Sequence, residues 1–369
     1  MTILRLRRAF RPRRLTAVTW AGSSLATVAL VLVSAFGFRL GGAAGSGSPY
    51  TREVAVAVAA LQSRYSAGSY RQTRSWQSAN ALQAAIDYMR ATGSRAYLED
   101  VDDAYRSHHA SDGFLGRYYD DEGWWAVTWI SAYQLTGEGR YLDQARDIFA
   151  DMTGGWDGAC GGGLWWSKAR SYKNAIANEL FLSVAASLHR LLPGDTAYAA
   201  WAQREWAWFR GTGMITPRHL VIDGLGACRP LLGSPTWTYN QGVLIGGLTA
   251  LAGFTHDAAA LRTSREVAEA VIRSRGLSPG GILREPCEPS GTCDPDARIF
   301  KGIFMRNLKS LYDRVGDPRY EAYMRANAES VWAQDRRGSQ FGLHWAGPFD
   351  STDTAVRAAA VDILATQAD

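Results

Sequence analysis

Apolar residues recur at every third or fourth position through most of the chain from about residue 50 onward. This spacing is typical of helices that bury one face. The alternation of β-branched and polar residues that marks strands is nearly absent. Twelve helices are therefore predicted, over residues 51–64, 75–91, 95–108, 121–136, 139–152, 172–191, 195–211, 236–254, 257–274, 297–315, 317–334 and 351–367.

The joints between these helices alternate in length. Five short joints each contain a glycine, which can end a helix in a left-handed conformation: Gly93, Gly137, Gly194, Gly253 and Gly316. Five long joints are rich in glycine, aromatic and polar residues: 109–120, 153–171, 212–235, 275–296 and 335–350. This pattern indicates a degenerate repeat of helical hairpins. We expect an all-α (α/α)6 toroid of six hairpins, with an open α-solenoid as the alternative.

Such a ring would gather the short joints at one end and the long joints at the other. Long loops on a rigid scaffold are where binding and catalytic sites are usually built. The long joints are therefore the first place to look for chemistry.

Charge is unevenly distributed along the 369 residues. The net charge is +5, but residues 1–39 hold seven arginines and no acid, so the remainder carries −2. A basic start, an uncharged run over 15–38 and small residues over 41–48 predict a cleaved signal peptide or a single transmembrane anchor over residues 1–45. We expect residues 46–369 to form one exported, monomeric domain, either secreted or anchored to the plasma membrane through this segment. The slightly acidic body gives no reason to expect a nucleic-acid partner.

Four cysteines suit an oxidising compartment. Of the three possible pairings we favour Cys287 with Cys293 and Cys160 with Cys228, with free buried thiols as the alternative. The histidines show no metal-ligand spacing, and the glycines at 161–163 lack the following lysine and hydroxyl residue of a phosphate-binding loop. We therefore expect neither a metal nor a cofactor.

Two adjacent carboxylates, Asp120 and Asp121, stand where a long joint meets a predicted helix, just before Trp124 and Trp125. Hydrolysis of a glycosidic bond needs two carboxyl groups, and a separation of about 5 Å is associated with retention of configuration. A helix N-terminus favours the ionised form of one group, while burial against indole raises the pKa of the other. The competing interpretation is an ordinary helix cap.

Motifs in the long joints make the chain similar to glycoside hydrolase family 76, the endo-α-1,6-mannanases and their transglycosylating fungal relatives. They are Tyr119-Asp-Asp-Glu-Gly-Trp-Trp125, Gly162-Gly-Leu-Trp-Trp166 with Lys173-Asn-Ala-Ile-Ala-Asn178, Trp237-Thr-Tyr-Asn-Gln-Gly-Val243, Phe300-Lys-Gly-Ile-Phe304 and Phe341-Gly-Leu-His-Trp-Ala-Gly347. The resemblance implies the same (α/α)6 fold, with Asp120 as nucleophile and Asp121 as general acid/base.

Aromatic rings stack on sugar rings, and amides and charged groups bind hydroxyls. From the loop aromatics and these motifs, the candidate substrate-binding residues are Trp76, Trp124, Trp125, Trp165, Trp166, Asn174, Tyr239, Asn240, Gln241, Lys301 and Trp345. The leading hypothesis is an exported retaining endo-α-1,6-mannosidase acting on mannan-type polysaccharide of a cell envelope. A mannan transglycosidase with the same residues and a non-catalytic carbohydrate-binding protein are the alternatives.

Overall fold

The computed structural model describes residues 48–368, so the predicted leader over 1–45 lies outside the described residues. Six outer helices occupy this range: α1 (Pro49–Gln62), α3 (Leu98–His109), α5 (Gly139–Thr153), α7 (Thr196–Phe209), α9 (Ala258–Arg273) and α11 (Pro318–Gln334). Six inner helices alternate with them: α2 (Ser75–Thr92), α4 (Tyr119–Thr136), α6 (Ala175–Leu191), α8 (Thr238–Thr255), α10 (Phe300–Val315) and α12 (Thr354–Ala365). Each of the twelve predicted helices is present, with ends shifted by a few residues.

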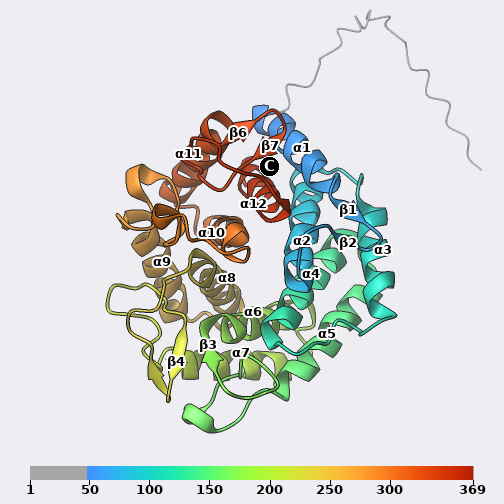
Figure 1. The fold of residues 1–369 in the computed structure, drawn as a ribbon. Coiled ribbons are helices and arrows are strands. Elements are labelled where there is room, and N and C mark those ends of the chain that lie inside the picture. Colours follow the sequence, from blue (N-terminus) through green and yellow to red (C-terminus); the bar gives the residue numbers. More distant parts are fainter. Residues whose placement is uncertain (1–47, 369) are drawn as a thin grey trace, which may run out of the picture. The chain divides into compact units, whose positions relative to one another are not determined.

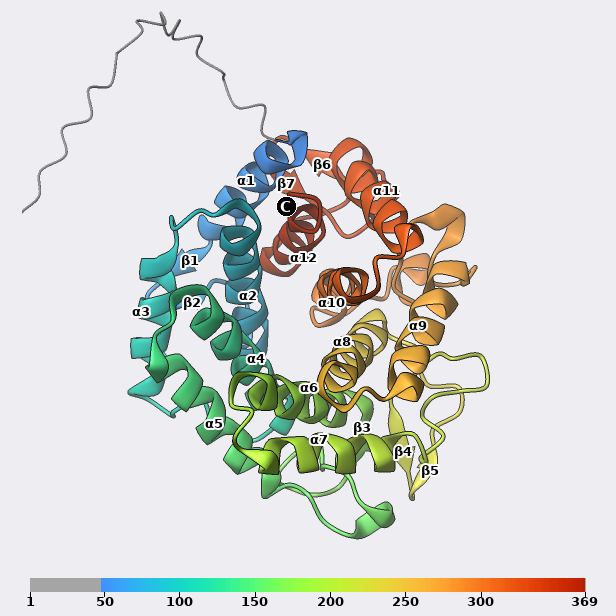
Figure 2. The ribbon, with the colours of Figure 1, turned by 180° about the vertical axis from the view of Figure 1, so that it is seen from behind.

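The inner helices pack in a closed ring, each against the next, with α12 returning to α2. The outer helices surround this ring (Figures 1 and 2). Helix α1 packs against both α12 and α2 and so closes the sixth hairpin with the last helix. The fold is therefore the predicted all-α toroid, and its core is the layer between the two rings. The inner helices α6 and α8 are buried over most of their lengths because they are covered on nearly every side.

Glycines end three of the inner helices in the left-handed conformation that the sequence predicts. Gly93, Gly137 and Gly316 follow α2, α4 and α10 with φ angles of 70°, 76° and 65°.

The prediction of a left-handed glycine is wrong at Gly194 and Gly253. Helix α6 ends before Leu192, because the residue that precedes a proline is disfavoured in the helical conformation. Helix α8 continues through Gly253, and His256 takes the left-handed position with φ 55°.

Short strands, which the sequence pattern did not predict, fasten the long loops. A two-stranded pair joins β1 (Tyr65–Ser66) to β2 (Ser69–Tyr70), and another joins β6 (Arg336–Arg337) to β7 (Gln340–Phe341). A three-stranded sheet runs in the order β3 (Lys173–Asn174), β4 (Gly224–Gly226) and β5 (Arg229–Pro230). It ties the loop before α6 to the loop before α8.

Two disulfides add to these ties, and both match the favoured pairing. Cys160–Cys228 links the loop before α6 to the turn between β4 and β5, across 68 residues. Cys287–Cys293 closes a short loop before α10. Within residues 48–368, no helix is long and apolar enough to span a bilayer.

Candidate active site

Helix α4 begins at Tyr119, so Asp120 and Asp121 lie in its first turn, at the end of the ring that carries the long loops. The N-cap residue is Tyr118, which is extended and makes no side-chain cap hydrogen bond. Tyr118 bridges to Ser167, and the Tyr119 N–H donates to Trp166 O at 2.9 Å. The loop at 166–167 therefore fixes where α4 starts. Neither aspartate is the N-cap residue of α4, which leaves both carboxyl groups available for chemistry.

Asp120 is held by the indole of Trp166. The Trp166 Nε1–H donates to Asp120 Oδ2 at 2.9 Å, whereas Asp120 Oδ1 is buried with no hydrogen-bond donor among the described residues. Burial and the neighbouring Asp121 raise the pKa of Asp120 to about 8, against the lowering effects of the indole and the backbone N–H groups at the start of α4. One oxygen is thus fixed and the other is free to react.

Asp121 faces the start of α2 and the loop before α10. Trp125, one turn further along α4, donates its indole N–H to Ser75 Oγ at 2.8 Å, which places this face of α4 beside the α2 N-terminus. Arg74 there forms a 2.8 Å ion pair with Asp296. The pKa of Asp121 is raised to about 6, by burial first and then by the Asp296 charge, while Arg74 lowers it.

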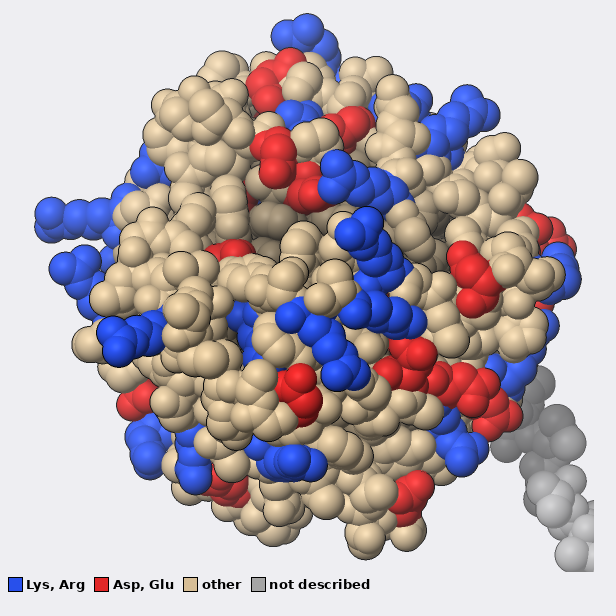
Figure 3. All heavy atoms as spheres, turned by 60° about the horizontal axis from the view of Figure 1, so that its bottom comes forward, with Lys and Arg blue, Asp and Glu red and all other residues tan. Residues whose placement is uncertain are grey.

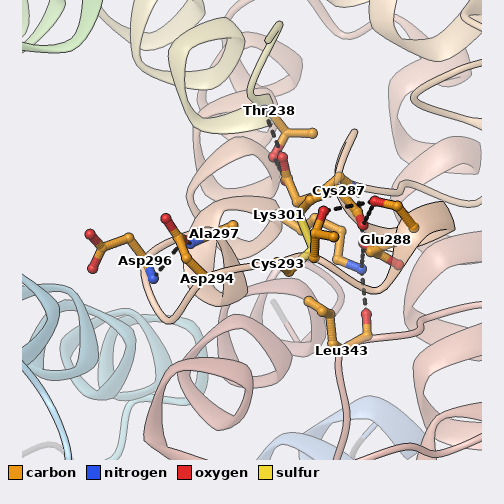
Figure 4. Close-up of a disulfide and its surroundings, with 12 residues drawn as sticks. Thr238, Cys287, Glu288, Cys293, Asp294, Asp296, Ala297, Lys301 and Leu343 are labelled. Atoms are coloured by element: carbon orange, nitrogen blue, oxygen red, sulfur yellow. Dashed lines mark hydrogen bonds and ion pairs between the residues drawn. A yellow bond between two sulfur atoms is a disulfide. The ribbon is translucent and has the colours of Figure 1, made fainter.

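The Arg74–Asp296 pair joins segments 222 residues apart. Gln77 steadies it by donating to Pro295 O at 2.9 Å and to Asp296 Oδ1 at 3.3 Å. Asp294 accepts from the N–H groups of residues 296 and 297 and so forms a turn just before α10 (Figure 4). Nothing in the local sequence marks Arg74 or Asp296 as neighbours of Asp121, because only closure of the ring brings them there.

An aromatic floor lies beneath the aspartates. Trp124 stacks on Trp76 with ring centres 6.1 Å apart and on Tyr239 at 6.5 Å. Tyr239 in turn stacks on Phe300 at 3.8 Å. The charge of Asp120 contributes to the raised pKa of Tyr239, which places the phenol near that carboxylate. Of the predicted substrate contacts, Trp76, Trp124, Trp166 and Tyr239 are therefore brought together around the pair.

Two further polar groups border this floor and were missed from the sequence. Tyr172 donates its hydroxyl to Asp223 Oδ2 at 2.7 Å, and its ring meets Trp166 edge-on. The charge of Asp223 is the largest electrostatic contribution that raises the pKa of Tyr239. Asp223 therefore lies beside the phenol. Its sequence context, Ile222-Asp-Gly224, signals only a turn.

Glu122, the third acid of the motif, has a structural contact. It is fully buried and accepts from the Gly116 N–H at 2.9 Å and from Lys168 Nζ at 3.0 Å. Lys168 also pairs with Asp151 at 2.9 Å. Glu122 thereby links the loop before α4, through Gly116, to the loop before α6, through Lys168.

Four predicted substrate residues instead make contacts inside the protein. Trp125 is 2% exposed and bonded to α2 as described above. Trp165 donates to Asp157 Oδ2 at 2.7 Å, Asn174 caps α6 through Ala177 N–H, and Gln241 bonds both backbone groups of residue 221. The indole N–H groups of Trp125 and Trp165, the Gln241 amide and Asn174 Oδ1 are thus hydrogen-bonded inside the protein, and a sugar contact for these four residues stays a prediction.

The same holds for Lys301 and Trp345. The Lys301 ammonium donates to Glu288 Oε1 at 2.6 Å and to Leu343 O, beside the Cys287–Cys293 loop (Figure 4). It lies 4.8 Å from the ring centre of Trp345, which is 1% exposed. Both side chains are covered and contact each other and the neighbouring loops, so a sugar contact for either stays a prediction.

Asn240 follows Tyr239 in the first turn of α8. It is fully buried, and its amide oxygen and nitrogen find no partner among residues 48–368. The two carboxyl oxygens of buried Glu179 on neighbouring α6 are likewise unpartnered. A sugar contact for Asn240 stays a prediction.

Charges of both signs are interspersed on the side of the ring where α7 and β4 come forward. Figure 3 shows a row of Lys and Arg side chains there beside a hollow that contains Asp and Glu side chains.

Within the described part of the chain, no group of three or more His, Cys, Asp or Glu residues could hold a metal ion.

The family model of glycosyl hydrolase family 76 matches residues 57–368, which is nearly the whole described chain. The chain belongs to glycosyl hydrolase family 76. Its curated relatives in the family include a putative mannan endo-1,6-alpha-mannosidase of Schizosaccharomyces pombe, 29% identical over 63% of this chain and 58% of that protein. The mannan endo-1,6-alpha-mannosidase DCW1 of Saccharomyces cerevisiae is 27% identical over 73% of this chain and 66% of its own length. The chain thus spans less than two thirds of the length of these relatives.

Solved structures of family 76 proteins share the fold. An α-1,6-mannanase of Salegentibacter, in an inactive variant with two adjacent aspartates replaced by asparagine and bound to α-1,6-mannotriose, superposes with a TM-score of 0.79. It is 21% identical, over 86% of this chain and 99% of that chain. The Dfg5 protein of Chaetomium thermophilum, in complex with glucosamine, superposes with a TM-score of 0.78 at 19% identity, over 86% of this chain and 90% of that chain.

Proposed function

We propose that this chain is a retaining endo-α-1,6-mannosidase that hydrolyses α-1,6-linked mannan of a cell envelope, with Asp120 as nucleophile and Asp121 as general acid/base. The observation that carries the proposal is the pair of adjacent carboxyl groups in the first turn of α4, one of them fixed by Trp166 above an aromatic floor. The names of the curated relatives and the mannotriose bound to the Salegentibacter variant supply the substrate class.

In the first step, Asp121 protonates the glycosidic oxygen while Asp120 Oδ1 attacks C1 from the opposite side, so the bond between C1 and the glycosidic oxygen breaks, the released chain leaves as an alcohol, and a glycosyl ester of Asp120 forms. The second oxygen of Asp120 stays hydrogen-bonded to Trp166, which keeps the attacking oxygen in place. In the second step, Asp121 removes a proton from water, the water attacks C1, and the bond to Asp120 breaks. Two inversions give net retention.

This mechanism needs one proton on the pair. With pKa values of about 8 for Asp120 and about 6 for Asp121, the free enzyme holds one proton between those pH values, and holds it on Asp120. Substrate covers Asp121 and raises its pKa by desolvation, while positive charge developing at C1 favours the ionised form of Asp120. Both effects favour the proton on Asp121 as the transition state is approached.

The order of the two pKa values in the free site also suggests the reverse roles, with Asp120 as the acid, and leaving-group chemistry separates the two assignments. A dinitrophenyl leaving group needs no proton. Asp121→Asn should therefore retain activity toward a dinitrophenyl α-1,6-mannobioside while losing activity toward mannan, and Asp120→Asn should lose both. The opposite pattern would exchange the roles.

Hydrolysis itself is tested with linear and branched α-1,6-mannans, with products resolved by size. We expect wild-type protein to shorten the linear polymer internally and Asp120→Asn to leave it intact while keeping its helical circular dichroism. Products longer than the substrate in the presence of excess acceptor would point to transglycosylation. Binding without any cleavage would overturn the enzymatic proposal.

We also infer that the domain is exported. The two disulfides of the described chain fit an oxidising compartment, and the basic, then apolar sequence over residues 1–45 fits a signal peptide or anchor. We expect a reporter that is fused after residue 369 to be active outside the cytoplasm. Reporter activity confined to the cytoplasm would refute export.

A further inference from the structure

A cavity of about 720 Å³ opens on the ring axis at the end opposite the aspartates. The second halves of all six inner helices line it. On α4, Ser131 of its wall lies ten residues beyond Asp121, which is about 15 Å along the helix. The inner ring that surrounds this axis is visible in Figure 2. The volume is in the range of sites for small molecules, about 300 to 1,000 Å³.

Three arginines belong to the outer part of this cavity. Arg90, Arg190 and Arg314 are exposed and lie in the last turns of α2, α6 and α10, which are alternate helices of the inner ring. Arg90 donates to Gln134 at 3.3 Å, whereas neither Arg190 nor Arg314 has an ion pair or side-chain hydrogen bond within residues 48–368. Two guanidinium groups are thus free to bind an anionic group, for which their planar fork of donors is suited.

The inner part offers acceptors and hydroxyl groups and no aromatic ring among the residues of its wall. Gln83 Oε1 and Asp362 Oδ1 are buried and lack a hydrogen-bond donor among the described residues. Ser183 and Ser187 stand in the same wall. Buried acceptors without partners are costly, and hydroxyl groups of a ligand would satisfy them.

Arg306 separates this cavity from the floor of the active site. It pairs with Asp362 at 3.2 Å and donates to Asn80. Its guanidinium carbon lies 5.8 Å from the ring centre of Trp124. A ligand in the cavity and a sugar over Trp124 would therefore occupy different sites on either side of Arg306.

We propose that this cavity is a second ligand site, for a small polyol that carries one phosphate group. The phosphate would bind between Arg190 and Arg314, and the hydroxyl groups would reach the acceptors of Gln83 and Asp362. Unlike the active site, this second site would bind its ligand without stacking on aromatic rings.

Stabilisation of helix C-termini by cations is the competing explanation for the arginines. By itself it does not explain why the basic residues occur on alternate inner helices, since the last turns of α4, α8 and α12 contain none. It also leaves the unpartnered acceptors on Gln83 and Asp362 unexplained.

The test is isothermal titration calorimetry of the full-length protein with mannose 6-phosphate and glucose 6-phosphate, compared with the free sugars and inorganic phosphate. We expect at least one sugar phosphate to bind more tightly than its free sugar and than phosphate alone. The double variant Arg190→Ala/Arg314→Ala should weaken binding by at least about tenfold, because two charge-assisted contacts are lost. Its hydrolysis of mannan should be unchanged.

Two matched variants locate the binding. Arg218→Ala/Arg229→Ala removes two exposed arginines on the long-loop side and should not alter the affinity. Asp120→Asn/Asp121→Asn should bind the sugar phosphate with wild-type affinity even though mannan is no longer cleaved. The proposal is overturned if neither sugar phosphate binds, if the Arg190/Arg314 variant binds normally, if the aspartate variant loses binding, or if phosphate alone binds as tightly.

Discussion

Replacing Asp296 by asparagine and Arg74 by glutamine should shift the pH dependence of catalysis in opposite directions. Both changes break the same 2.8 Å ion pair, but they remove charges of opposite sign from beside Asp121. The Asp296 charge raises the pKa of Asp121 and the Arg74 charge lowers it. Asp296→Asn should therefore lower the pKa of Asp121, and Arg74→Gln should raise it.

The size of the shift follows from Coulomb's law with strong screening. The Arg74 side chain is 67% exposed and that of Asp296 is 29% exposed, so an effective dielectric constant of about 40 to 80 applies. With a separation of about 6 Å, the upper end of the range over which a charge usually shifts a neighbouring pKa, a unit charge contributes about 0.7 to 1.4 kcal/mol, or about half to one pKa unit.

The assay is the pH profile of kcat/KM on linear α-1,6-mannan. Wild-type protein should give a bell with limbs near pH 6 and pH 8, the pKa values of Asp121 and Asp120. Asp296→Asn should move the acid limb down by about half to one unit and Arg74→Gln should move it up by the same amount. Glu321→Gln, which breaks the exposed pair with Arg325 on α11, is the control and should not move it.

A merely structural role of the ion pair predicts a different result. If the pair only fastens α2 to the loop before α10, both variants lose the same contact and should change activity and melting temperature alike. Acid limbs that shift in the same direction, or that do not move, would refute the electrostatic reasoning.

Three further predictions concern residues around Asp120 and the disulfides. Trp166→Phe keeps the ring but removes the hydrogen bond to Asp120, so kcat should fall about ten- to hundredfold with little change in KM; an unchanged kcat would show that the indole only packs. Because the fold raises the pKa of Asp120 to about 8, its carboxyl destabilises the fold increasingly as pH rises from its unfolded pKa near 4 to about 8. Asp120→Asn should thus gain melting temperature relative to wild type over that pH range, and a constant difference would contradict the burial of a charge. Replacing Cys160 and Cys228 by serine opens a loop of 68 residues and should cost about 4 kcal/mol of unfolding free energy, against about 2 kcal/mol for the short Cys287–Cys293 loop, as measured by urea denaturation; equal losses would contradict the loop-closure argument.

The helices could be predicted from sequence because the spacing of the apolar residues in each helix shows which of its faces is buried. The joints were predictable where a glycine ends the helix, as at Gly93 and Gly137. The joints were not predictable where the proline after Leu192 ends α6 early, or where His256 takes the left-handed position after α8. Those outcomes depend on the local competition between neighbouring residues, and a single glycine does not reveal it.

The aspartate pair was predictable because it stands at the junction of a loop and a helix in one continuous segment. Its electrostatic partners were not, since Arg74 and Asp296 meet only when the ring closes. Lys301 shows that a sequence motif can also indicate a ligand contact where the structure shows contacts inside the protein. Its sequence motif marks it as a candidate, but whether an ammonium points to a ligand or to a buried glutamate is decided by the packing of the loops before α10 and α12.

The most direct test of retaining hydrolysis at this pair is proton NMR of the anomeric signals during cleavage of linear α-1,6-mannan. We expect the α-anomer of the new reducing end to appear first and to convert to the equilibrium mixture afterwards. A β-anomer at the earliest times, or no new reducing ends at all, would contradict it.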